Sequence, residues 1–337
     1  MQNIWDELPK PYFVLAPMDD VTDTVFRRIV GDCAAPDVFF TEFVNVDGLQ
    51  SPGRKRLLNR LQFTPKETPL IAQIWGKTPE NYYKTAKELA DGTFALESSN
   101  LEDTNFAGID LNFGCPDKAV VKNGCCVALV NDRPLAQEII QATKEGAGGK
   151  LPVSVKTRLG FNEVDYSWPE FLLEQDIAVL TMHGRTRKQM SKVPADWDAI
   201  GKVRELRDKL GVATHIVGNG DVMTRQQGLE LATTHQLDGI MIGRGIFQDP
   251  YVFVSESPWH KMGALERLEL YKKHVELFAE TWGDTGRHVR VLNKFCKVYI
   301  NDFPSAKHLR EQLMNAQHTD ELLQLLEQAT KYEFTRA

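Results

Sequence analysis

A cysteine stands at the end of a strand-like run over Gly108–Pro116, which reads GIDLNFGCP. The apolar residues of this run would share one face of a strand, and Asp110 and Asn112 would share the opposite face. Glycine and proline then break the strand on either side of Cys115. Polar side chains on the inner face of a strand are costly unless they bind something, so the run predicts a binding site with a thiol at its edge. The alternative is a buried structural cysteine in a loop.

Two glycine-rich turns could hold a phosphate group. Gly218-Asn219-Gly220 and Gly243-Arg244-Gly245 each follow an apolar, strand-like segment. Glycines let backbone N–H groups approach an anion closely, and Arg244 adds a fixed positive charge. Each turn alone could be an ordinary chain reversal, but the two together predict a phosphate site.

The segment Val153–Leu159 would place a lysine inside the sheet. Lys156 and Arg158 alternate with apolar or small residues, so both would share the inner face of the strand. A buried lysine needs an anionic or strongly polar partner, because burying an isolated charge is too costly. A purely structural ion pair with Asp110 or Glu42 is the alternative.

These groups together suit a flat, phosphate-bearing redox ring such as FMN. Lys156 beside the N1–C2=O edge of the ring would stabilise its anionic reduced form, and Gln73 could pair with the pyrimidine edge. Asn112 would supply a second amide. A phosphosugar isomerase, which uses the same kind of phosphate loops, is the main alternative at this point.

Eight short apolar segments, separated by stretches of helical pattern, carry these residues. The segments are Phe13–Ala16, Val38–Phe43, Leu70–Trp75, Gly108–Phe113, Val153–Leu159, Ala178–His183, Thr214–Gly218 and Gly239–Gly243. Helix start signals stand between them, as at Thr78-Pro79-Glu80 and Asp132-Arg133-Pro134. Repeated strand–helix units predict an α/β fold with a parallel sheet, and eight of them favour a (β/α)8 TIM barrel, whose chemistry collects at the carboxyl ends of the strands. A doubly wound open sheet is the alternative.

Strand signals stop after the eighth segment. Ser255–Pro258 looks like a linker, and the remaining pattern is helical, with regularly spaced leucines in Thr319–Tyr332. We therefore expect a catalytic barrel domain over residues 1–250 and a small carboxyl-terminal helical bundle over 259–337. Residues Phe94–Phe106 resemble a polar insertion, to which we assign no function.

The composition limits the class of protein. The chain of 337 residues carries a formal net charge of −6, which argues against a protein that coats nucleic acid through bulk charge. No apolar run is long enough to span a bilayer, and the amino-terminal residues lack a secretion signal, so no membrane association is expected. Five cysteines without a framework spacing favour reduced thiols in the cytoplasm, and no cysteine–histidine cluster predicts a metal site.

The strand ends, taken together, resemble those of the tRNA-dihydrouridine synthases. The matching motifs follow the order of the strands and are Leu15-Ala16-Pro17-Met18, Thr41-Glu42-Phe43, Ile71-Ala72-Gln73-Ile74, Asp110-Leu111-Asn112-Phe113-Gly114-Cys115-Pro116, Val155-Lys156-Thr157-Arg158, His183-Gly184-Arg185-Thr186, Gly218-Asn219-Gly220-Asp221 and Met241-Ile242-Gly243-Arg244-Gly245. The helical carboxyl-terminal part also fits this family. Two segments, Thr41–Asp47 and Asp284–Gly286, resemble the bacterial branch that acts at U16 in the D-loop of tRNA.

The resemblance implies an FMN-dependent enzyme that reduces specific uridines in tRNA to 5,6-dihydrouridine, with NADPH as the reductant. It implies that Cys115 is the proton donor. The residues expected to bind FMN are Pro17, Met18, Gln73, Lys156, His183, Asn219, Gly220, Asp221, Gly243 and Arg244. The residues expected near the target base are Asn112, Arg158 and Arg185.

Elementary chemistry agrees with these roles. The C5=C6 bond of uracil is conjugated to a carbonyl group, so a hydride from N5 of reduced FMN should add at C6. A proton must then reach C5 from the opposite face. A thiol with an ordinary pKa of about 8.5 is mostly protonated at neutral pH, so Cys115 can be that acid. Asn112 and a cationic side chain would stabilise the developing oxyanion.

The chain departs from the family pattern in Asn123–Leu129, which reads NGCCVAL. Members of the family usually have a stretch of glycine and alanine there. We expect Cys125 and Cys126 to replace these small residues in packing.

The target base must leave the tRNA stack to reach a buried flavin, so the binding surface should carry local positive charge. Two groups of basic residues qualify. The group after the sixth strand is Arg185, Arg187, Lys188 and Lys192. The group in the helical part is Arg287, His288, Arg290, Lys294, Lys297, Lys307, His308 and Arg310. A solvated helical face is the alternative for the second group.

Two other functions remain open at this point. The first is an FMN-dependent barrel oxidoreductase that acts on a free small-molecule enone or dihydropyrimidine. The second is a tRNA-binding chaperone without catalysis, against which the presence of Cys115, Lys156 and His183 argues. No obligatory protein partner is evident from the sequence.

Overall fold

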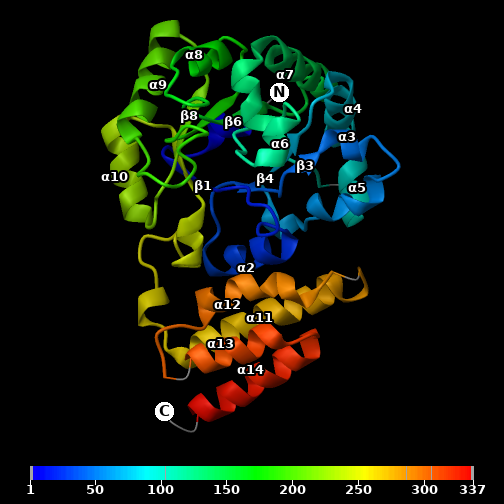
Figure 1. The fold of residues 1–337 in the computed structure, drawn as a ribbon, viewed down its shortest axis with the longest axis vertical. Coiled ribbons are helices and arrows are strands. Elements are labelled where there is room, and N and C mark those ends of the chain that lie inside the picture. Colours follow the sequence, from blue (N-terminus) through cyan, green and yellow to red (C-terminus); the bar gives the residue numbers. More distant parts are fainter. Residues whose placement is uncertain (1–2, 103, 286, 305, 335–337) are drawn as a thin grey trace.

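The computed structural model describes residues 3–102, 104–285, 287–304 and 306–334, which form a barrel followed by a helical bundle (Figure 1). The strands are β1 (Tyr12–Leu15), β2 (Phe39–Phe40), β3 (Val44–Asn45), β4 (Leu70–Trp75), β5 (Gly108–Phe113), β6 (Val153–Arg158), β7 (Val179–His183), β8 (His215–Asn219) and β9 (Gly239–Ile242). They pair in parallel in the order β1-β9-β8-β7-β6-β5-β4-β2, and β3 also pairs with β4. A bridge between Val14 and Val38 closes the ring. The predicted TIM barrel is confirmed.

The second barrel position, predicted as one strand over Val38–Phe43, is broken into β2 and β3. Thr41 causes the break, because its hydroxyl donates to the carbonyl of Glu42 at 2.7 Å and accepts the backbone N–H of Gln73 at 3.0 Å. A side chain thus replaces part of the backbone ladder toward β4. The break leaves the Glu42 side chain buried at the end of β2.

Strand alternation divides the barrel interior into an apolar layer and a polar layer. The apolar layer contains Trp5 of the short helix α1 (Ile4–Glu7) and the inward side chains Tyr12, Val14, Val38, Phe40, Ile71, Val179, Val217 and Met241. Nearer the carboxyl ends, the inward side chains of β4, β5 and β6 are polar. The strand register places Gln73 beside Asp110, and Asp110 beside Ser154. The interior is therefore a packed core with a polar floor for the site above it.

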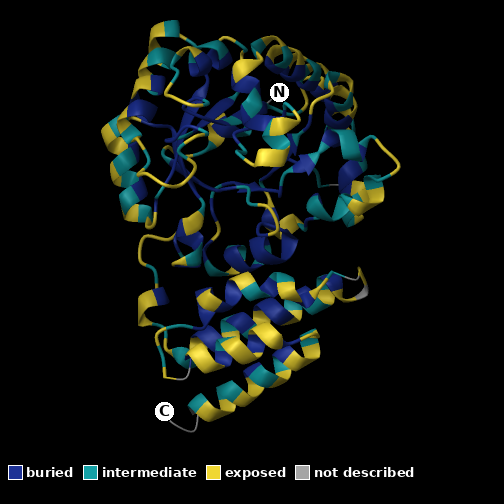
Figure 2. Ribbon diagram, in the orientation of Figure 1, coloured by how far each residue is buried: buried dark blue, intermediate teal, exposed yellow. Residues whose placement is uncertain are grey.

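Helices cover the outside of the barrel, and Figure 2 shows their exposed residues facing away from the buried strands. They are α2 (Thr24–Ala34), α4 (Pro79–Ala90), α7 (Arg133–Ala147), α8 (Ser167–Leu173), α9 (Trp197–Leu210) and α10 (Arg225–His235), with the shorter α3 (Val46–Leu49), α5 (Thr93–Ser99) and α6 (Lys118–Lys122). The predicted start signals are confirmed: α4 begins after Thr78, and the Asp132 side chain accepts the N–H of Leu135 at the start of α7. None of the helices in the described ranges is long and apolar enough to cross a membrane.

The segment predicted as a polar insertion over Phe94–Phe106 instead begins with a packed helix, α5. Phe94 is fully buried there, with the guanidinium carbon of Arg54 lying 4.3 Å from its ring centroid. The helix α5 has only seven residues, so its apolar pattern is too short to distinguish a helix from a loop in the sequence. Residue 103 of this segment and Gly286 of the motif at 284–286 lie outside the described residues.

The carboxyl-terminal bundle is attached to the barrel through α2. Its helices are α11 (Ala264–Trp282), α12 (Asn293–Tyr299), α13 (Ala306–Asn315) and α14 (Thr319–Phe334), which confirms the helical pattern predicted for this part. Trp282 donates its indole N–H to Asp23 at 3.1 Å, and the ring of Phe26 stacks on Phe295 with centroids 4.9 Å apart. In Figure 1 the bundle lies beneath the barrel, with α2 between them. The domain boundaries at residues 250 and 259 stay a prediction.

A buried ion pair in the barrel wall gives a stability prediction. Arg27 of α2 donates its Nε–H to Glu67 at 2.7 Å, and both side chains are fully buried. Glu67→Gln should lower the free energy of unfolding by about 3 kcal/mol, because the guanidinium would stay buried without its counter-charge. Urea unfolding followed by circular dichroism would measure the change. As a control, Asp208→Asn on the exposed face of α9 should cost less than about 1 kcal/mol. Equal effects would contradict the prediction.

Candidate active site

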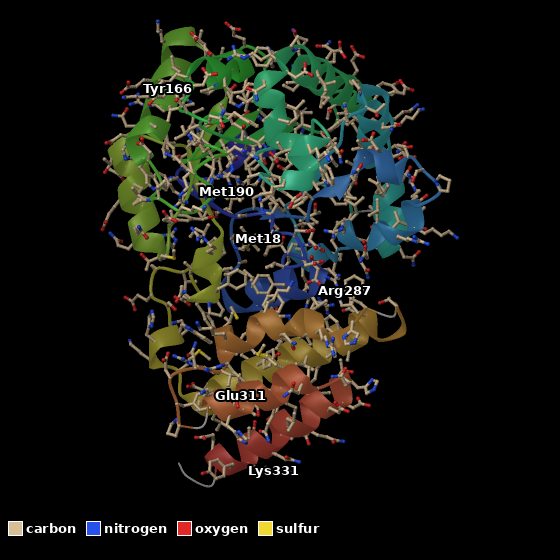
Figure 3. The ribbon with its side chains drawn as sticks, viewed as in Figure 1. Met18, Tyr166, Met190, Arg287, Glu311 and Lys331 are labelled. Atoms are coloured by element: carbon tan, nitrogen blue, oxygen red, sulfur yellow. The ribbon has the colours of Figure 1, made fainter. Side chains whose placement is uncertain are left out.

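A cavity of about 200 Å³ lies at the carboxyl ends of β1, β6, β7, β8 and β9. It is lined by Ala16, Pro17, Met18, Lys156, Arg158, His183, Ser191, Asn219, Gly220, Asp221, Val222, Met223, Met241, Gly243, Arg244 and Gly245. Every residue predicted to bind the cofactor lines this cavity, except Gln73. Figure 3 labels Met18 at this end of the barrel, with Met190 of the loop after β7 near it in the view.

The two glycine-rich turns form one side of the cavity and could approach an anion closely. Gly220 has a φ of +134°, and a Cβ there would lie 2.7 Å from Ala195 Cβ. A Cβ on Gly245 would lie 2.4 Å from the carbonyl oxygen of Val222. Neither position can therefore hold a larger residue without rearrangement. These tight turns and the half-exposed Arg244 make a cradle suited to a phosphate group.

Asp221 links two arginines beside this cradle. Its carboxylate accepts hydrogen bonds from Arg185, which is buried, and from Arg244 at 2.7 Å. The backbone N–H of Ala195 donates to the same carboxylate at 3.0 Å. Arg185 does not line the 200 Å³ cavity but lines a neighbouring hollow of about 490 Å³ together with residues of the loop after β7. Asp221 thus links Arg185, which lines the second hollow, to Arg244, which lines both.

Lys156 points into the cavity from β6. Its Nζ donates to the amide oxygen of Asn219 at 3.2 Å, and Asn219 is itself fixed by donating to the carbonyl of Met241 at 2.8 Å. Among the described residues no direct ion pair joins Lys156 to Asp110 or Glu42, but the charge of Asp110 still acts on Lys156 and opposes the lowering of its pKa. Burial, and then the charge of Arg158, lowers the pKa of Lys156 to about 8. A cation therefore remains at the cavity floor at neutral pH.

Gln73 is fully buried and acts within the polar layer. Its amide nitrogen donates to Asp110 at 2.8 Å, and its amide oxygen accepts from Asn112 at 3.2 Å. Ser154 donates to the other oxygen of Asp110 at 2.6 Å. Burial raises the pKa of Asp110 to about 6, and the hydrogen bonds from Ser154 and Gln73 oppose that rise. Sequence alternation predicted that Asp110 faces inward, but it did not predict that Asp110 holds Gln73.

The Cys115 tip is fixed by the side chain of Asn112. The amide oxygen of Asn112 accepts the backbone N–H groups of Gly114 at 3.1 Å and Cys115 at 3.0 Å. Arg158 donates to the carbonyl of Gly114 at 2.8 Å, and to the carbonyl of Met190 at 3.2 Å. These bonds tie the turn after β5 to the loop after β7. The turn that bears Cys115, a partly exposed residue, is therefore held beside Arg158, which lines the cavity.

The thiol of Cys115 is more acidic than the ordinary value expected from the sequence. A hydrogen bond from the Cys126 thiol is the largest cause, and it lowers the pKa of Cys115 to about 7 against the opposing effect of burial. The expectation that Cys126 replaces a small residue in packing stays a prediction. Near neutral pH a substantial part of Cys115 is still protonated, and a pKa close to the working pH suits a general acid.

His183 stays neutral at the wall of the cavity. Burial is the largest cause that lowers its pKa far below the ordinary value, and the charges of Lys156, Arg158, Arg185 and Arg244 act in the same direction. Arg185 lies 3.3 Å from Nε2 of His183. The ring is therefore a neutral hydrogen-bonding group and not a general acid.

One group of acidic side chains among the described residues has metal-ligand spacing, formed by Asp19, Asp20 and Glu42. Arg60 already donates hydrogen bonds to Asp19 and Glu42 and lies 3.8 Å from Asp20. Its guanidinium occupies the place that a cation would take. Burial raises the pKa of Glu42 to about 7, which further reduces its negative charge.

The two basic groups predicted from the sequence are partly committed to structural contacts. In the bundle, Lys294 donates to the carbonyl of Asp20 at 2.5 Å, and Arg287 lies 3.4 Å from Asp23. Figure 3 shows Arg287 between the barrel and the bundle. The exposed members of the two groups are Lys188, Lys192, His288, Arg290, Lys294, Lys297, Lys307 and His308.

Comparisons with known proteins agree with this geometry. Residues 14–335 match the family described as dihydrouridine synthase (Dus). The chain is 46% identical over 329 residues to a probable tRNA-dihydrouridine synthase of Staphylococcus epidermidis, covering 97% of this chain and 96% of that protein. It is 45% identical over 330 residues to probable tRNA-dihydrouridine synthase 2 of Bacillus subtilis, with 97% and 96% covered. Histamine dehydrogenase from Rhizobium sp. 4-9 shares the fold, with a TM-score of 0.52 and 12% identity over 82% of this chain and 51% of that one.

The neutral state of His183 gives a prediction about pH. The imidazole should show no protonation between about pH 5 and 9, because the ordinary histidine pKa of about 6.5 is lowered by burial and by the surrounding cations. Nitrogen NMR of selectively labelled histidine would follow the ring. As a control, the same ring in the urea-unfolded chain should titrate near pH 6.5. A midpoint above pH 5 in the folded protein would contradict the prediction.

Proposed function

This chain belongs to the dihydrouridine synthase family, and from that premise we propose that it reduces specific uridines in tRNA to 5,6-dihydrouridine. The observation that carries the proposal is that Arg158, which lines a cationic cavity with a phosphate cradle, also holds the turn that bears the Cys115 thiol. The family match covers the barrel and the bundle alike. A barrel oxidoreductase for a free enone or dihydropyrimidine is not favoured, because relatives named as tRNA-dihydrouridine synthases match 97% of the chain.

The residues around the cavity fit a flavin, and we propose FMN. Gly220, Gly243 and Arg244 would hold its phosphate, since the close approach that a Cβ would block is available at Gly220. Pro17, Met18, Asn219 and Asp221 would line the remainder of the site. When bound and reduced, the flavin supplies the hydride that adds to C6 of the uracil ring. NADPH is the proposed source of the electrons.

Lys156 and His183 would define the electrostatics of the bound ring. Lys156 brings a positive charge to the cavity floor, held in place by Asn219 at 3.2 Å. His183 contributes a neutral donor or acceptor, because the surrounding cations suppress its protonation. Gln73 would act indirectly, by fixing Asn112 and Asp110 beneath the site.

Cys115 would donate the proton to C5 of the uracil. The amide oxygen of Asn112 accepts the backbone N–H groups of Gly114 and Cys115, so we assign Asn112 to positioning the thiol. Arg158 lines the cavity and carries the charge that can stabilise the oxyanion developing on the uracil carbonyl. Arg185 lines the neighbouring hollow and is the second cation available to the base.

The proposed substrate is folded tRNA, in the cytoplasm, with the target base extruded from its stack. Exposed cations lie on the loop after β7, at Lys188 and Lys192, and on the helical part, at Arg290 and Lys297. We propose that these side chains contact the phosphate backbone, with residues 1–250 as the catalytic domain and 259–337 as the tRNA-binding domain.

The visible spectrum of the purified protein under anaerobic conditions tests the proposal. NADPH should bleach an oxidised flavin band, and unmodified tRNA should then restore it, whereas free uridine should not. Bleaching that tRNA does not reverse would favour a small-molecule oxidoreductase. The lack of a flavin band after FMN is supplied would contradict the cofactor assignment.

The role of Cys115 gives a separate prediction. Cys115→Ala should keep bound FMN and NADPH oxidation but lose dihydrouridine formation by roughly 100-fold or more, the usual contribution of a general acid. Mass spectrometry of tRNA nucleosides would measure the product. Cys33→Ala, which removes a thiol on α2 outside the cavity, is the matched control. Unchanged product formation in Cys115→Ala would remove this thiol from the mechanism.

A further inference from the structure

The turn after β7 brings Arg185 back onto the ring of His183. Only Gly184 separates the two residues, and the backbone N–H of Arg185 donates to the carbonyl of His183 at 2.7 Å. A Cβ on Gly184 would lie 3.0 Å from both the backbone nitrogen and the backbone oxygen of Asp196, so glycine suits this position. The turn thus places the guanidinium against the imidazole, with Nη1 lying 3.3 Å from Nε2 of His183.

Every nitrogen of the Arg185 guanidinium has a partner within the protein. Its Nε–H donates to the carbonyl of Val193 at 2.6 Å, and its Nη2 donates to the carboxylate of Asp221. The remaining nitrogen, Nη1, is the one that approaches His183. The residue is only 2% exposed. Because the guanidinium is planar and held at two other nitrogens, the direction in which Nη1 meets the ring is fixed.

The chemistry of the two groups decides the direction of this hydrogen bond. An arginine guanidinium carries donors and no acceptor, so Nη1 can only donate and Nε2 of His183 must accept. Burial is the largest cause that lowers the pKa of His183 far below the ordinary value, so the ring is neutral. A neutral imidazole has one N–H, and the hydrogen bond made at one nitrogen determines which nitrogen carries it.

The other ring nitrogen, Nδ1, lies on the side of the ring away from the phosphate cradle. A Cβ on Gly220 would lie 3.4 Å from Cδ2 and 3.5 Å from Nε2 of His183, so this edge of the ring faces the glycine-rich turn. Nδ1 has no hydrogen-bond partner among the residues that the structure describes. The other cations that act on the ring, Lys156, Arg158 and Arg244, are donors and cannot accept from it. Since His183 lines the cavity, Nδ1 is left for a ligand there.

We propose that Arg185 is a positioning residue that holds His183 as the Nδ1–H tautomer, so that the ring presents a hydrogen-bond donor to the ligand in the cavity. The inference rests on the proposed function, which places a flavin there. A flavin offers carbonyl oxygens and ring nitrogens that can accept this bond. With the proton on Nε2 instead, a donor would face the Arg185 donor and a bare Nδ1 would face the flavin acceptor, so both bonds would be lost.

Nitrogen NMR of the purified full-length protein, with both ring nitrogens of histidine labelled, identifies the tautomer directly. Protonated and bare ring nitrogens resonate at well separated frequencies. Nε2 is recognised because it couples to both carbon-bound ring protons, whereas Nδ1 couples strongly to only one. The signal that His183→Gln removes belongs to His183. We expect a bare Nε2 and a protonated Nδ1 in the parent protein, and a protonated Nε2 would overturn the proposal whatever the flavin content.

Arg185→Met tests the cause of the tautomer. This variant keeps an unbranched side chain but removes the donors, so His183 should change mostly to the Nε2–H form that free histidine prefers. Arg187→Met is the matched control, because the guanidinium carbon of Arg187 lies 5.0 Å from the ring centroid of Phe161 and Arg187 is not among the cations that act on His183. It should leave the tautomer unchanged. A ring that stays Nδ1–H in folded Arg185→Met would overturn the proposal, and the parent protein alone decides if that variant does not fold.

Flavin affinity is the second readout, measured by the quenching of flavin fluorescence. FMN and riboflavin share the ring, but only FMN carries the phosphate. The loss of a bond to the ring should therefore weaken both ligands alike, whereas a disturbed Arg244 would weaken FMN alone. Arg185→Met should raise the Kd of both by about tenfold, the effect of one acceptor left unpaired, and Arg187→Met should change neither.

The two readouts separate this proposal from the proposed function. A loss of affinity confined to FMN would overturn the donor role of His183. A parent protein that binds no flavin would overturn the proposed cofactor, and the NMR spectrum would still decide whether Arg185 sets the tautomer of His183.

Discussion

The site depends on one constraint, which is that a charged or polar group turned into a closed barrel is costly to bury unless it finds a partner there. The parallel register decides which groups can meet, because it sets Asp110 between Gln73 and Ser154, and sets Asn112 beside Lys156. The amides and the carboxylate therefore satisfy one another in the layer beneath the cavity. Lys156 and Arg158, in contrast, line the cavity itself. A ligand in that cavity meets cations first.

The excess of positive charge around the cavity follows from that arrangement. Burial keeps His183 neutral, and the charges of Lys156, Arg158, Arg185 and Arg244 act in the same direction. Asp221 compensates only in part, since its single carboxylate serves both Arg185 and Arg244. The remaining positive charge favours an anionic ligand, such as a phosphate-bearing cofactor or an RNA backbone.

The sequence predicted the positions that strand alternation controls. A period of two residues places Asn112 and Lys156 on inward faces of their strands, and the structure confirms that placement. The sequence did not predict the break in the second strand. The break arises because the Thr41 hydroxyl, and not a backbone carbonyl, accepts the N–H of Gln73. Nor did the sequence predict the lowered pKa of Cys115, because the largest cause is Cys126, a residue further along the chain. The available signal was a cysteine where the family pattern has small residues.

The attachment of the bundle fixes its position beside the cavity. Lys294 of α12 donates to the carbonyl of Asp20, in the loop after β1 that also supplies Met18 to the cavity. Asp23, at the start of α2, accepts from Trp282 of α11. Two helices of the bundle are therefore fastened to the segment that begins at the cavity wall, which leaves little freedom between them. If the bundle binds tRNA as proposed, this junction would set which nucleotide reaches Cys115, and base recognition inside the cavity would have only to accept a uracil.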